Sequence, residues 1–431
     1  MKNRSRLLQN GTPGTGNILY WMSREQRVSN NAALLFASYL AKESGKLLEV
    51  LFVIDNTYPN ANLRSFSFMI EGLKEVKLQL EALGIPFYLR SGKIPEMITE
   101  YLNLHQNAVL ITDFNPLRHA LAWKKQLLNS VSIPVYEVDG HNIVPCWIAS
   151  DKQEYAARTF RPKITRQLAD YLYPFPETET LKQEVSVHFE TVNWEEILAS
   201  LKIDRSVSPS GIQAGEKAAR RTLQVFIDER IRDYAVERNH IRVNGCSGLS
   251  PYIHFGQISA LEIALEVIKQ CPADENREAF LEQLIVRREL AENFCYYNPH
   301  YDSFKGFPSW AQKTLFEHQH DVREYLYSRF ELEQAQTHDL IWNEAQTTLV
   351  QSGTMHNYLR MYWGKKILEW SATAEEAIQT AVYLNDKYQL DGRDPNGYTG
   401  CAWCIGGVHD RPWFRRSIFG NIRYMGSKKL K

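Results

Sequence analysis

Three tryptophans in the second half of the chain, Trp342, Trp363 and Trp370, are spaced in a way that could support electron transfer. Trp363 and Trp370 are two helical turns apart in one segment, which is roughly 10 Å along a helix axis. Trp342 belongs to the element before it. Indole rings at such separations could pass electrons towards a redox cofactor. Aromatic residues at this spacing are, however, more often a stripe of core residues. The tryptophans alone therefore leave electron transfer and packing both open.

A second group of chemically interesting residues is polar. The stretch 385–397 is crowded with Asn, Asp and Gly, and such a turn could present polar groups to a nitrogen-rich ring system. It lacks the alternating oxygen ligands and final Glu of an EF-hand loop. Upstream, hydroxyl and backbone donors precede a predicted helix, as a phosphate clamp requires. They belong to Ser247, Gly248, Leu249 and Ser250.

The cysteines favour neither a metal site nor a disulfide framework. Cys401 and Cys404 form an isolated CxxC, whereas zinc needs two more ligands and a redox pair belongs beside a strand–helix turn. We predict no metal site. Six scattered Cys in 431 residues indicate reduced thiols of an intracellular protein. The start of the chain has no apolar signal-peptide region, and no apolar run is long enough to span a membrane. We expect a soluble intracellular protein.

The first 150 residues are predicted to form a Rossmann-like α/β domain. Short apolar runs alternate with segments of helical length, which is typical of a parallel sheet covered on both faces. Ligands of such sheets bind beyond the carboxyl ends of the strands. The predicted strands are 17–22, 48–54, 85–89, 108–112 and 134–138, and the predicted helices are 29–43, 63–83, 95–104 and 116–129.

Two local signals bear on the start of this domain. Ser29 is predicted to cap the first helix, and Gly45 to end it. The glycine-rich stretch 11–16 precedes the first strand, whereas a dinucleotide-binding fingerprint follows a strand and opens a helix. We therefore interpret 11–16 as part of a flexible leader.

The second half is predicted to be a separate, all-helical domain. Helical patterns dominate after a Pro- and Ser-rich connector that contains one short helix near 194–201. The predicted organisation is an α/β domain over 1–173, a connector over 174–215 and a helical domain over 216–431. The predicted helices of the last domain are 216–234, 260–270, 278–294, 322–329, 348–368 and 374–388.

Overall charge gives little indication of a nucleic-acid partner. Lys plus Arg and Asp plus Glu each number 50, so the formal net charge is zero. A nucleic-acid-binding face must therefore be local. The best candidate is the segment 411–431, which has seven basic residues and no acid.

Several long segments resemble the photolyase–cryptochrome superfamily, and in detail the class II cyclobutane pyrimidine dimer photolyases. The resemblance implies a helical FAD-binding domain after the α/β domain. It covers both predicted domains, so it is more specific than any single motif. The segments are YWMSREQR (20–27), HNIVPCWIASDK (141–152), EYAARTFRPKI (154–164), LRMYWGKKILEW (359–370), LNDKYQLDGRDPNGY (384–398), GGVHDRPW (406–413) and FGNIRYM (419–425).

The resemblance also implies residue roles. Trp363 and Trp342 would form an inner electron-transfer pair, Trp370 an outer donor and Tyr327 a side branch. Asn385 would face a ring nitrogen of the flavin. The residues holding FAD would be Tyr234, Ser247, Gly248, Leu249, Ser250, Asn357, Arg360 and Asp391, with Arg360 and Asp391 paired. Those around a flipped dimer would be Arg238, Asn239, Met361 and Trp403.

One departure from the family pattern concerns the substrate pocket. The family typically has two successive acids before LeuIleVal, and one of them steadies the dimer radical, but this chain has Glu282 and Gln283. The spacing to the other matching residues predicts Gln283 in the pocket. An amide can donate hydrogen bonds but cannot supply a proton, so slower repair is one consequence. Arg287 stands where some members have an aromatic residue.

The function implied is light-driven repair of pyrimidine dimers in UV-damaged DNA, by a monomeric lyase. An antenna pigment, with a deazaflavin as the family-based choice, would sit between the domains. The alternative is a cryptochrome-like blue-light photoreceptor with weak or no repair. A photolyase for the (6-4) lesion, which would use histidines such as His254, His356 and His409, fits the segments less well. Without the resemblance, a nucleotide-binding module with a helical interaction domain would also remain.

Overall fold

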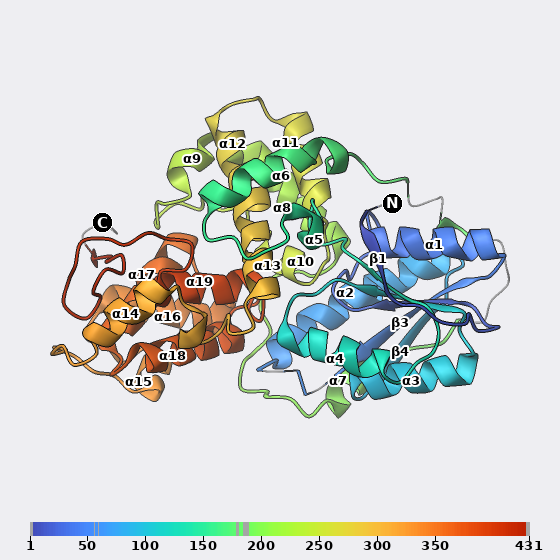
Figure 1. Cartoon of the computed structure of the whole chain (residues 1–431), viewed down its shortest axis with the longest axis horizontal. Coiled ribbons are helices and arrows are strands. Elements are labelled where there is room, and N and C mark those ends of the chain that lie inside the picture. Colours follow the sequence, from blue (N-terminus) through green and yellow to red (C-terminus); the bar gives the residue numbers. More distant parts are fainter. Residues whose placement is uncertain (1–2, 56, 59, 178–180, 184–188, 428–431) are drawn as a thin grey trace.

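The computed structural model describes residues 3–55, 57–58, 60–177, 181–183 and 189–427. Figure 1 shows a strand-containing part, coloured blue to cyan, beside a larger assembly of helices coloured green to red. The predicted fold class, an α/β part followed by a helical part, is thus confirmed. No helix in the described part of the chain has both the length and the apolar composition to cross a membrane.

Six strands form one mixed sheet in the order β1-β6-β5-β2-β3-β4. The five strands from β2 to β6 are mutually parallel, and β1 pairs antiparallel with β6 at one edge. Strand order reverses beside β2, so the chain leaves a crevice at the carboxyl ends of β2 and β5. The strands are β1 (Ser5–Gln9), β2 (Ile18–Met22), β3 (Leu48–Ile54), β4 (Phe87–Ser91), β5 (Val109–Asp113) and β6 (Val135–Val138).

Side chains alternate along each strand, so the apolar strands present apolar residues on both faces of the sheet. Helices cover both of these faces. Ile18, Tyr20 and Met22 face the core beneath α1 (Ala32–Ser44) and α2 (Leu63–Ala82). Leu19 and Trp21 face the opposite core, which also contains residues of α3 (Ile94–His105) and α4 (Arg118–Leu128).

The ends of α1 show one correct and one wrong prediction. The N-cap is Asn31, whose side chain accepts a hydrogen bond from the Leu34 amide, and not Ser29. Asn31 also donates to the carbonyl oxygens of Glu25 and Arg27, so a buried loop fixes its position. Gly45 ends α1 in the left-handed conformation, as predicted.

The predicted flexible leader is wrong. Residues 5–9 form β1, which the sequence analysis missed because an edge strand of mixed polarity has little periodic signal. The glycine-rich stretch after it lies against the chain around 106 and 132. Thr12 donates to the Ser132 carbonyl (3.1 Å) and Gly16 to the Gln106 carbonyl (2.7 Å).

The helices of the second half are shorter and more often interrupted than the sequence predicted. Residues 322–328 are not helical, and α16 and α17 are separate where one helix over 348–368 was predicted, because Gly353 ends α16 with positive φ. The helices are α5 (Cys146–Ala149), α6 (Ala157–Tyr171), α7 (Trp194–Ser200), α8 (Glu216–Val225), α9 (Tyr234–Glu237), α10 (Ser250–His254), α11 (Ala260–Gln270), α12 (Glu275–Leu281), α13 (Arg288–Tyr297), α14 (Ser309–Glu317), α15 (Arg329–Glu333), α16 (Leu340–Ser352), α17 (Asn357–Trp370), α18 (Ala374–Tyr388) and α19 (Pro395–Gly406).

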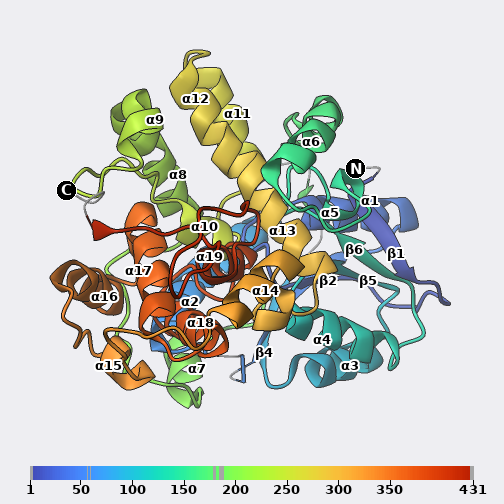
Figure 2. The same cartoon turned by 60° about the vertical axis from the view of Figure 1, so that its left-hand side comes forward.

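Helix α6 lies within the predicted α/β domain in sequence but packs against helices of the second half. Figure 2 shows it beside the group formed by α11, α12 and α13. Its Arg161 forms a bidentate pair with Glu282 (2.7 and 2.9 Å). One hydrophobic core also runs from the sheet into α8, α10 and α11. The two parts therefore pack as one body across the predicted boundary.

Arg64 of α2 illustrates this packing, since its side chain joins the sheet region to the end of α16. It is 2% exposed. Its guanidinium donates to the carbonyl oxygens of Val350 (2.6 Å), Gln351 (3.1 Å) and Tyr388 (2.9 Å). A cation at a helix C-terminus also opposes the negative end of the helix dipole.

We predict that Arg64→Ala lowers the free energy of unfolding by about 3 kcal/mol, because several buried carbonyls lose a charged donor. Urea unfolding measures this change. Lys74→Ala is the control, because Lys74 lies on the same helix in an exposed pair with Glu71, and such pairs are worth about 1 kcal/mol or less. Equal effects of the two substitutions would contradict the prediction.

Candidate active site

The helical part contains a cavity of about 610 Å³, which is within the range of cofactor sites. Segments that are far apart in the sequence line it: the end of α9, the loop before α10, the middle of the α12–α13 helix, the start of α17 and the turn after α18. Ten residues predicted as site residues lie on its wall: Tyr234, Arg238, Ser247, Gly248, Leu249, Ser250, Gln283, Asn357, Arg360 and Asp391.

Two π-helical turns shape this wall. Residues Phe226–Arg230 form one and Glu282–Arg287 the other, and each interrupts what would otherwise be a continuous α-helix. A π-turn inserts an extra residue and so rotates the side chains that follow it. Tyr234 packs edge-on against Phe226 and Phe280, which fixes its ring at the cavity. Burial raises the pKa of Tyr234 to about 12, so its hydroxyl remains protonated at neutral pH.

The break between α16 and α17 provides a third part of the wall. After Gly353, His356 caps α17 by accepting a hydrogen bond at Nδ1 from the Tyr358 amide (3.2 Å). Asn357 and Arg360 are then three residues apart in the first turn of α17, on one face of the helix.

Arg360 and Asp391 form the predicted pair. Arg360 Nη2 lies 3.2 and 3.4 Å from the two carboxylate oxygens of Asp391 and 3.0 Å from Gln389 Oε1. Both charged groups line the cavity, so a bound ring system with donors and acceptors on its edge could contact a cation and an anion together.

Several polar atoms around the cavity are buried without a hydrogen-bond partner among the described residues. They are the Nε atoms of Arg230, Arg238 and Arg360 and Nε2 of His356. Buried polar groups are nearly always satisfied in folded proteins, so these atoms fit a polar, anionic ligand such as a dinucleotide. Neither Arg230 nor His356 was predicted as a cofactor-binding residue. Arg230 occupies an ordinary position in a helical pattern, whereas in the structure it is the last residue of a π-turn and lines the cavity.

Asn385 lies beside the cavity and is not on its wall. It is 2% exposed on α18, and its side-chain amide donates to Asp386 Oδ1 (3.0 Å). Gly397 at the start of α19 packs so closely that a Cβ there would lie 2.8 Å from Asn385 Nδ2. The predicted contact of Asn385 with a flavin ring stays a prediction.

Glu282 and Gln283, the pair that stands where the family typically has two acids, point in different directions in the structure. Gln283 lies on the cavity wall, whereas Glu282 points away to Arg161 and Arg287. The π-turn that contains both residues sets this register. Arg287 is exposed and lies 3.1 Å from Glu282 Oε1.

The predicted electron-transfer residues form one continuous series of rings. Trp363 and Trp342 are stacked with centroids 6.5 Å apart, and Trp342 meets Trp370 at 5.7 Å. Trp370 in turn contacts Tyr327, with centroids 5.5 Å apart. The indole nitrogen of Trp342 donates to the Trp363 carbonyl, and that of Trp363 to Gln346, so both rings are held in orientation.

The four residues predicted to contact a dimer are less closely grouped. Arg238 lines the cavity and Asn239 follows it in an exposed position. Met361 and Trp403, on adjoining helices α17 and α19, are half-buried and do not line the cavity. Lys365 lies fully buried beneath Trp403, with Nζ 4.6 Å from the ring centroid. Burial lowers the pKa of Lys365 to about 8.

The predicted basic patch is largely paired where the structure describes it. Arg415 pairs with Glu317 and Arg423 with Asp410, while Arg411 and Arg416 lie over aromatic rings. Lys428, Lys429 and Lys431 lie outside the described residues. A DNA-binding role for this segment stays a prediction.

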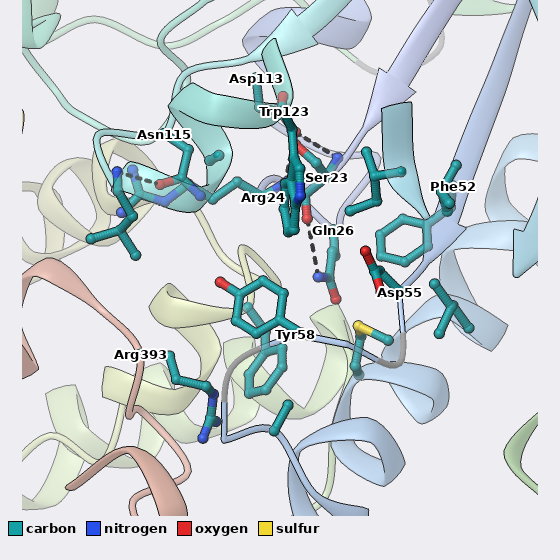
Figure 3. Close-up of a pocket in the computed structure, with 18 of the residues that line it drawn as sticks. Ser23, Arg24, Gln26, Phe52, Asp55, Tyr58, Asp113, Asn115, Trp123 and Arg393 are labelled. Carbon is teal, nitrogen blue, oxygen red and sulfur yellow. Dashed lines mark hydrogen bonds between the residues drawn. The ribbon is translucent and has the colours of Figure 1, made fainter. Parts of the chain in front are cut away.

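A second cavity lies between the sheet and the helices, beyond the carboxyl ends of β2, β3 and β5. Figure 3 shows Tyr58 and Trp123 at its centre, with Asp55 and Arg393 beside them. The rings of Tyr58 and Trp123 are 5.8 Å apart. This is the position where doubly wound sheets bind ligands, as the sequence predicted.

His254 and Asp394 belong to the walls of both cavities. Their side chains are in contact, with His254 Nδ1 3.1 Å from Asp394 Oδ2. Although burial alone would raise the pKa of Asp394, His254 and Arg24 hold it well below its usual range. The two cavities therefore share a wall that contains the carboxylate of Asp394.

The chain is similar in sequence to several proteins named deoxyribodipyrimidine photo-lyase. The DNA photolyase family matches residues 18–181. Over 412 residues the chain is 45% identical to the deoxyribodipyrimidine photo-lyase of Potorous tridactylus, covering 95% of this chain and 77% of that one. It is 42% identical to that of Arabidopsis thaliana (98% and 88% covered) and 41% identical to that of Methanothermobacter thermautotrophicus (96% and 91% covered).

Solved structures of the same fold include a Synechocystis cryptochrome (TM-score 0.73, 15% identity, 96% of this chain and 86% of that one covered). Another is a Sulfolobus tokodaii photolyase described with two FAD molecules (TM-score 0.71, 17% identity, 95% and 86% covered). The fold is therefore that of the photolyases and cryptochromes. Within this class, the sequence identities show that the chain belongs to the DNA photolyase family, as its resemblance to the class II enzymes predicted.

Buried charges at the junction of sheet and helices make stability dependent on pH. Glu25 pairs with Arg27 and with His141 Nδ1 (2.9 Å), and all three are nearly inaccessible. Burial alone would raise the pKa of Glu25, but Arg27 and His141 lower it to about 2. Because a lowered carboxyl pKa stabilises the ionised folded state, this contribution is present above about pH 4.3, the unfolded value. It is lost as the pH falls towards 2.

We predict that Glu25→Gln lowers the free energy of unfolding by about 3 kcal/mol at pH 7, as when one partner of a buried ion pair is removed. The difference from the unsubstituted chain should narrow as the pH falls below 4. Urea unfolding at a series of pH values measures both effects. The control is Glu71→Gln, which affects an exposed pair. If the variant and the unsubstituted chain differ in free energy of unfolding by the same amount at pH 7 and pH 3, this role for Glu25 is excluded.

Proposed function

We propose that this chain repairs cyclobutane pyrimidine dimers in DNA with light absorbed by a bound FAD. The observation that carries the proposal is the meeting of ten predicted site residues, from five separate segments, on one cavity. The relatives named deoxyribodipyrimidine photo-lyase, at 41–45% identity over nearly the whole chain, support the same reaction. In this proposal the enzyme is a carbon–carbon lyase that acts as a monomer on UV-damaged DNA inside the cell, and its domain limits are those predicted from the sequence.

The cavity residues suit an FAD. Arg230, whose Nε has no partner among the described residues, and the hydroxyls of Ser247 and Ser250 would hold the diphosphate. The Arg360–Asp391 pair would lie beside the flavin ring, with Asn357 close by and Asn385 behind. When bound and reduced, FAD supplies on illumination the electron that opens the cyclobutane ring, and no net oxidation results.

The ring series has a separate task, which is to deliver electrons to the cofactor site when the flavin is oxidised. Trp363 is its inner member, followed by Trp342, Trp370 and Tyr327. All three indoles are at most 3% exposed, so they are shielded from solvent. Tyr327, at the outer end of the series, is partly exposed.

The lesion must leave the duplex to reach the cavity. A damaged pair is the least costly to unstack, which favours dimers over intact DNA. Arg238 and Asn239 would contact polar edges and the strand, while Met361 and Trp403 would form apolar walls for the dimer. Gln283 would donate a hydrogen bond to a pyrimidine carbonyl. Phosphate contacts from the segment 411–431 would make binding dependent on salt.

We propose an antenna pigment for the cavity between the sheet and the helices, with a deazaflavin as the first candidate. The aromatic lining, which includes Trp21, Tyr58 and Trp123, suits a planar ligand. Asp55, Lys124 and Arg393 add polar groups that could orient it. The cryptochrome-like alternative shares the fold, so fold alone does not argue against it, but the sequence identities favour repair.

The decisive experiment is a light-versus-dark assay with reduced protein and an oligonucleotide that contains one cyclobutane thymine dimer. We expect the dimer to disappear only in the light. Protein that carries FAD yet leaves the dimer intact under illumination would refute repair and favour the photoreceptor.

We predict that Trp363→Phe blocks photoreduction of the bound flavin while chemically reduced protein still repairs dimers, because relay and repair use different residues. Flavin absorbance under illumination and the repair assay measure the two separately. Trp194→Phe, on α7 and outside the series, is the control. Loss of both activities in Trp363→Phe would contradict this division of roles.

We predict that Gln283→Glu raises the number of dimers split per absorbed photon by roughly two- to five-fold, equivalent to about 0.4–1 kcal/mol. A carboxyl group can supply a proton to the opening dimer, whereas the amide cannot. The measurement is the repair yield of reduced protein at a calibrated light dose. Glu282→Gln is the control, because Glu282 points away from the cavity. An unchanged or lower yield would contradict the prediction that a carboxyl group at this position improves repair.

A further inference from the structure

The outer end of the ring series contains a residue that the sequence analysis did not consider. The ring of His338 contacts Trp370, with centroids 5.2 Å apart, next to the contact between Trp370 and Tyr327. His338 is also stacked on Tyr325, with centroids 3.7 Å apart and planes 19° from parallel. Tyr327 and His338 therefore meet the same indole side by side.

Tyr327 contacts both the backbone and the imidazole of His338. The backbone amide of His338 donates to the phenolic oxygen of Tyr327 (3.0 Å), so one lone pair of that oxygen is occupied. The same oxygen lies 2.8 Å from His338 Nδ1. A phenol has one hydrogen to donate, and a neutral imidazole with its proton on Nε2 accepts at Nδ1. In that tautomer, the phenol proton is directed at the imidazole.

The backbone holds this arrangement in place. The Tyr327 amide donates to the Trp370 carbonyl (3.1 Å), which fixes Tyr327 at the end of α17. His338 directly precedes Asp339, whose side chain caps α16 by accepting from the Ile341 and Trp342 amides. Two anchored backbone segments therefore set the distance between the phenol and the imidazole.

We propose that His338 is the proton acceptor that makes Tyr327 the terminal electron donor of the ring series. The proposal rests on the proposed function, because light must first draw an electron from the tryptophans. Oxidation of a phenol makes its hydroxyl strongly acidic, so a base in place lets electron and proton leave together. An imidazole has this capacity, whereas most neutral side chains do not.

The step is balanced. The radical cation of Trp370 takes one electron from Tyr327 and becomes neutral, while the phenol O–H bond breaks and its proton moves to His338 Nδ1. The products are a neutral tyrosyl radical and an imidazolium, so the total charge is unchanged. A small thiol from solution then donates a hydrogen atom to the phenoxyl oxygen and leaves as a thiyl radical, and the imidazolium releases its proton to water. The site allows this because the Tyr327–His338 hydrogen bond lies at the surface.

The test is flash photolysis of the FAD-loaded full chain without added thiol, followed by transient absorption and electron paramagnetic resonance. In the unsubstituted chain, a tryptophan radical should give way to a tyrosyl radical, more slowly in D₂O. His338→Gln keeps an acceptor but not a base. It should slow tyrosyl formation at least ~10-fold, which is modest for the loss of a positioned base. Free imidazole should restore the rate in His338→Ala.

Two controls separate this role from packing. Tyr327→Phe should abolish the tyrosyl signal and prolong the tryptophan radical. Tyr325→Phe keeps the stacked ring on His338 and should behave as the unsubstituted chain. Tyrosyl formation at the unsubstituted rate in both His338 variants would overturn the proposal.

The protonation state of His338 provides a test that does not depend on light. In ¹⁵N-labelled protein, NMR should show neutral His338 with its proton on Nε2 and an unprotonated Nδ1. A proton on Nδ1 of the neutral ring would overturn the proposal. If no tryptophan radical forms after the flash, the result contradicts the proposed function and not the role of His338. The NMR result then still decides the role of His338.

Discussion

The buried pair between Arg24 and Glu292 is the interaction on which the geometry of both cavities depends. The guanidinium and the carboxylate meet through two hydrogen bonds of 2.6 and 2.9 Å, and both side chains are almost inaccessible to solvent. Arg24 follows β2 at the carboxyl edge of the sheet, and Glu292 lies on α13. A charge pair of this kind is costly to bury and tolerates little displacement. It therefore specifies how the helices sit on the sheet.

The surrounding polar groups extend this constraint. Asp113, at the end of β5, accepts hydrogen bonds from the amides of Ser23, Arg24 and Glu25, so the loop after β2 is fixed from the sheet side. From the helical side, Asp394 approaches Arg24 and pairs with His254. Because His254 and Asp394 face both cavities, a shift of the sheet against the helices would deform the two sites together. An antenna pigment and a flavin would thus be held at a fixed separation.

The regular parts of the fold were predictable from sequence, whereas the irregular parts that build the site were not. Strands β2 and β3 are short apolar runs and helices α11 and α18 follow a helical period, and the structure has all four where the sequence predicted. The π-turns have no such signal, since Phe226–Arg230 and Glu282–Arg287 read as ordinary helix. Arg230 was consequently missed. Trp342, Trp363, Trp370 and Tyr327 were assigned through the family resemblance, and geometry alone could not have separated them from core residues. His338 was missed because a single histidine before a helix is unremarkable until Tyr327 is beside it in space.

The ring series also shows why fold and chemistry are hard to separate in this protein. Trp342, Trp363 and Trp370 are among the best-buried side chains of the hydrophobic core formed by α16, α17, α18 and their neighbours, and two of their indole nitrogens have hydrogen-bond partners inside it. Close packing of large rings is what a stable helical core requires, and it also brings the rings into contact. Hopping between tryptophans needs little beyond this contact and a fixed orientation. The part of the proposed relay that packing does not explain is its end, where a phenol and an imidazole share a hydrogen bond at the surface. A core requires no such pair, so the proposed relay differs most clearly from ordinary packing at this end.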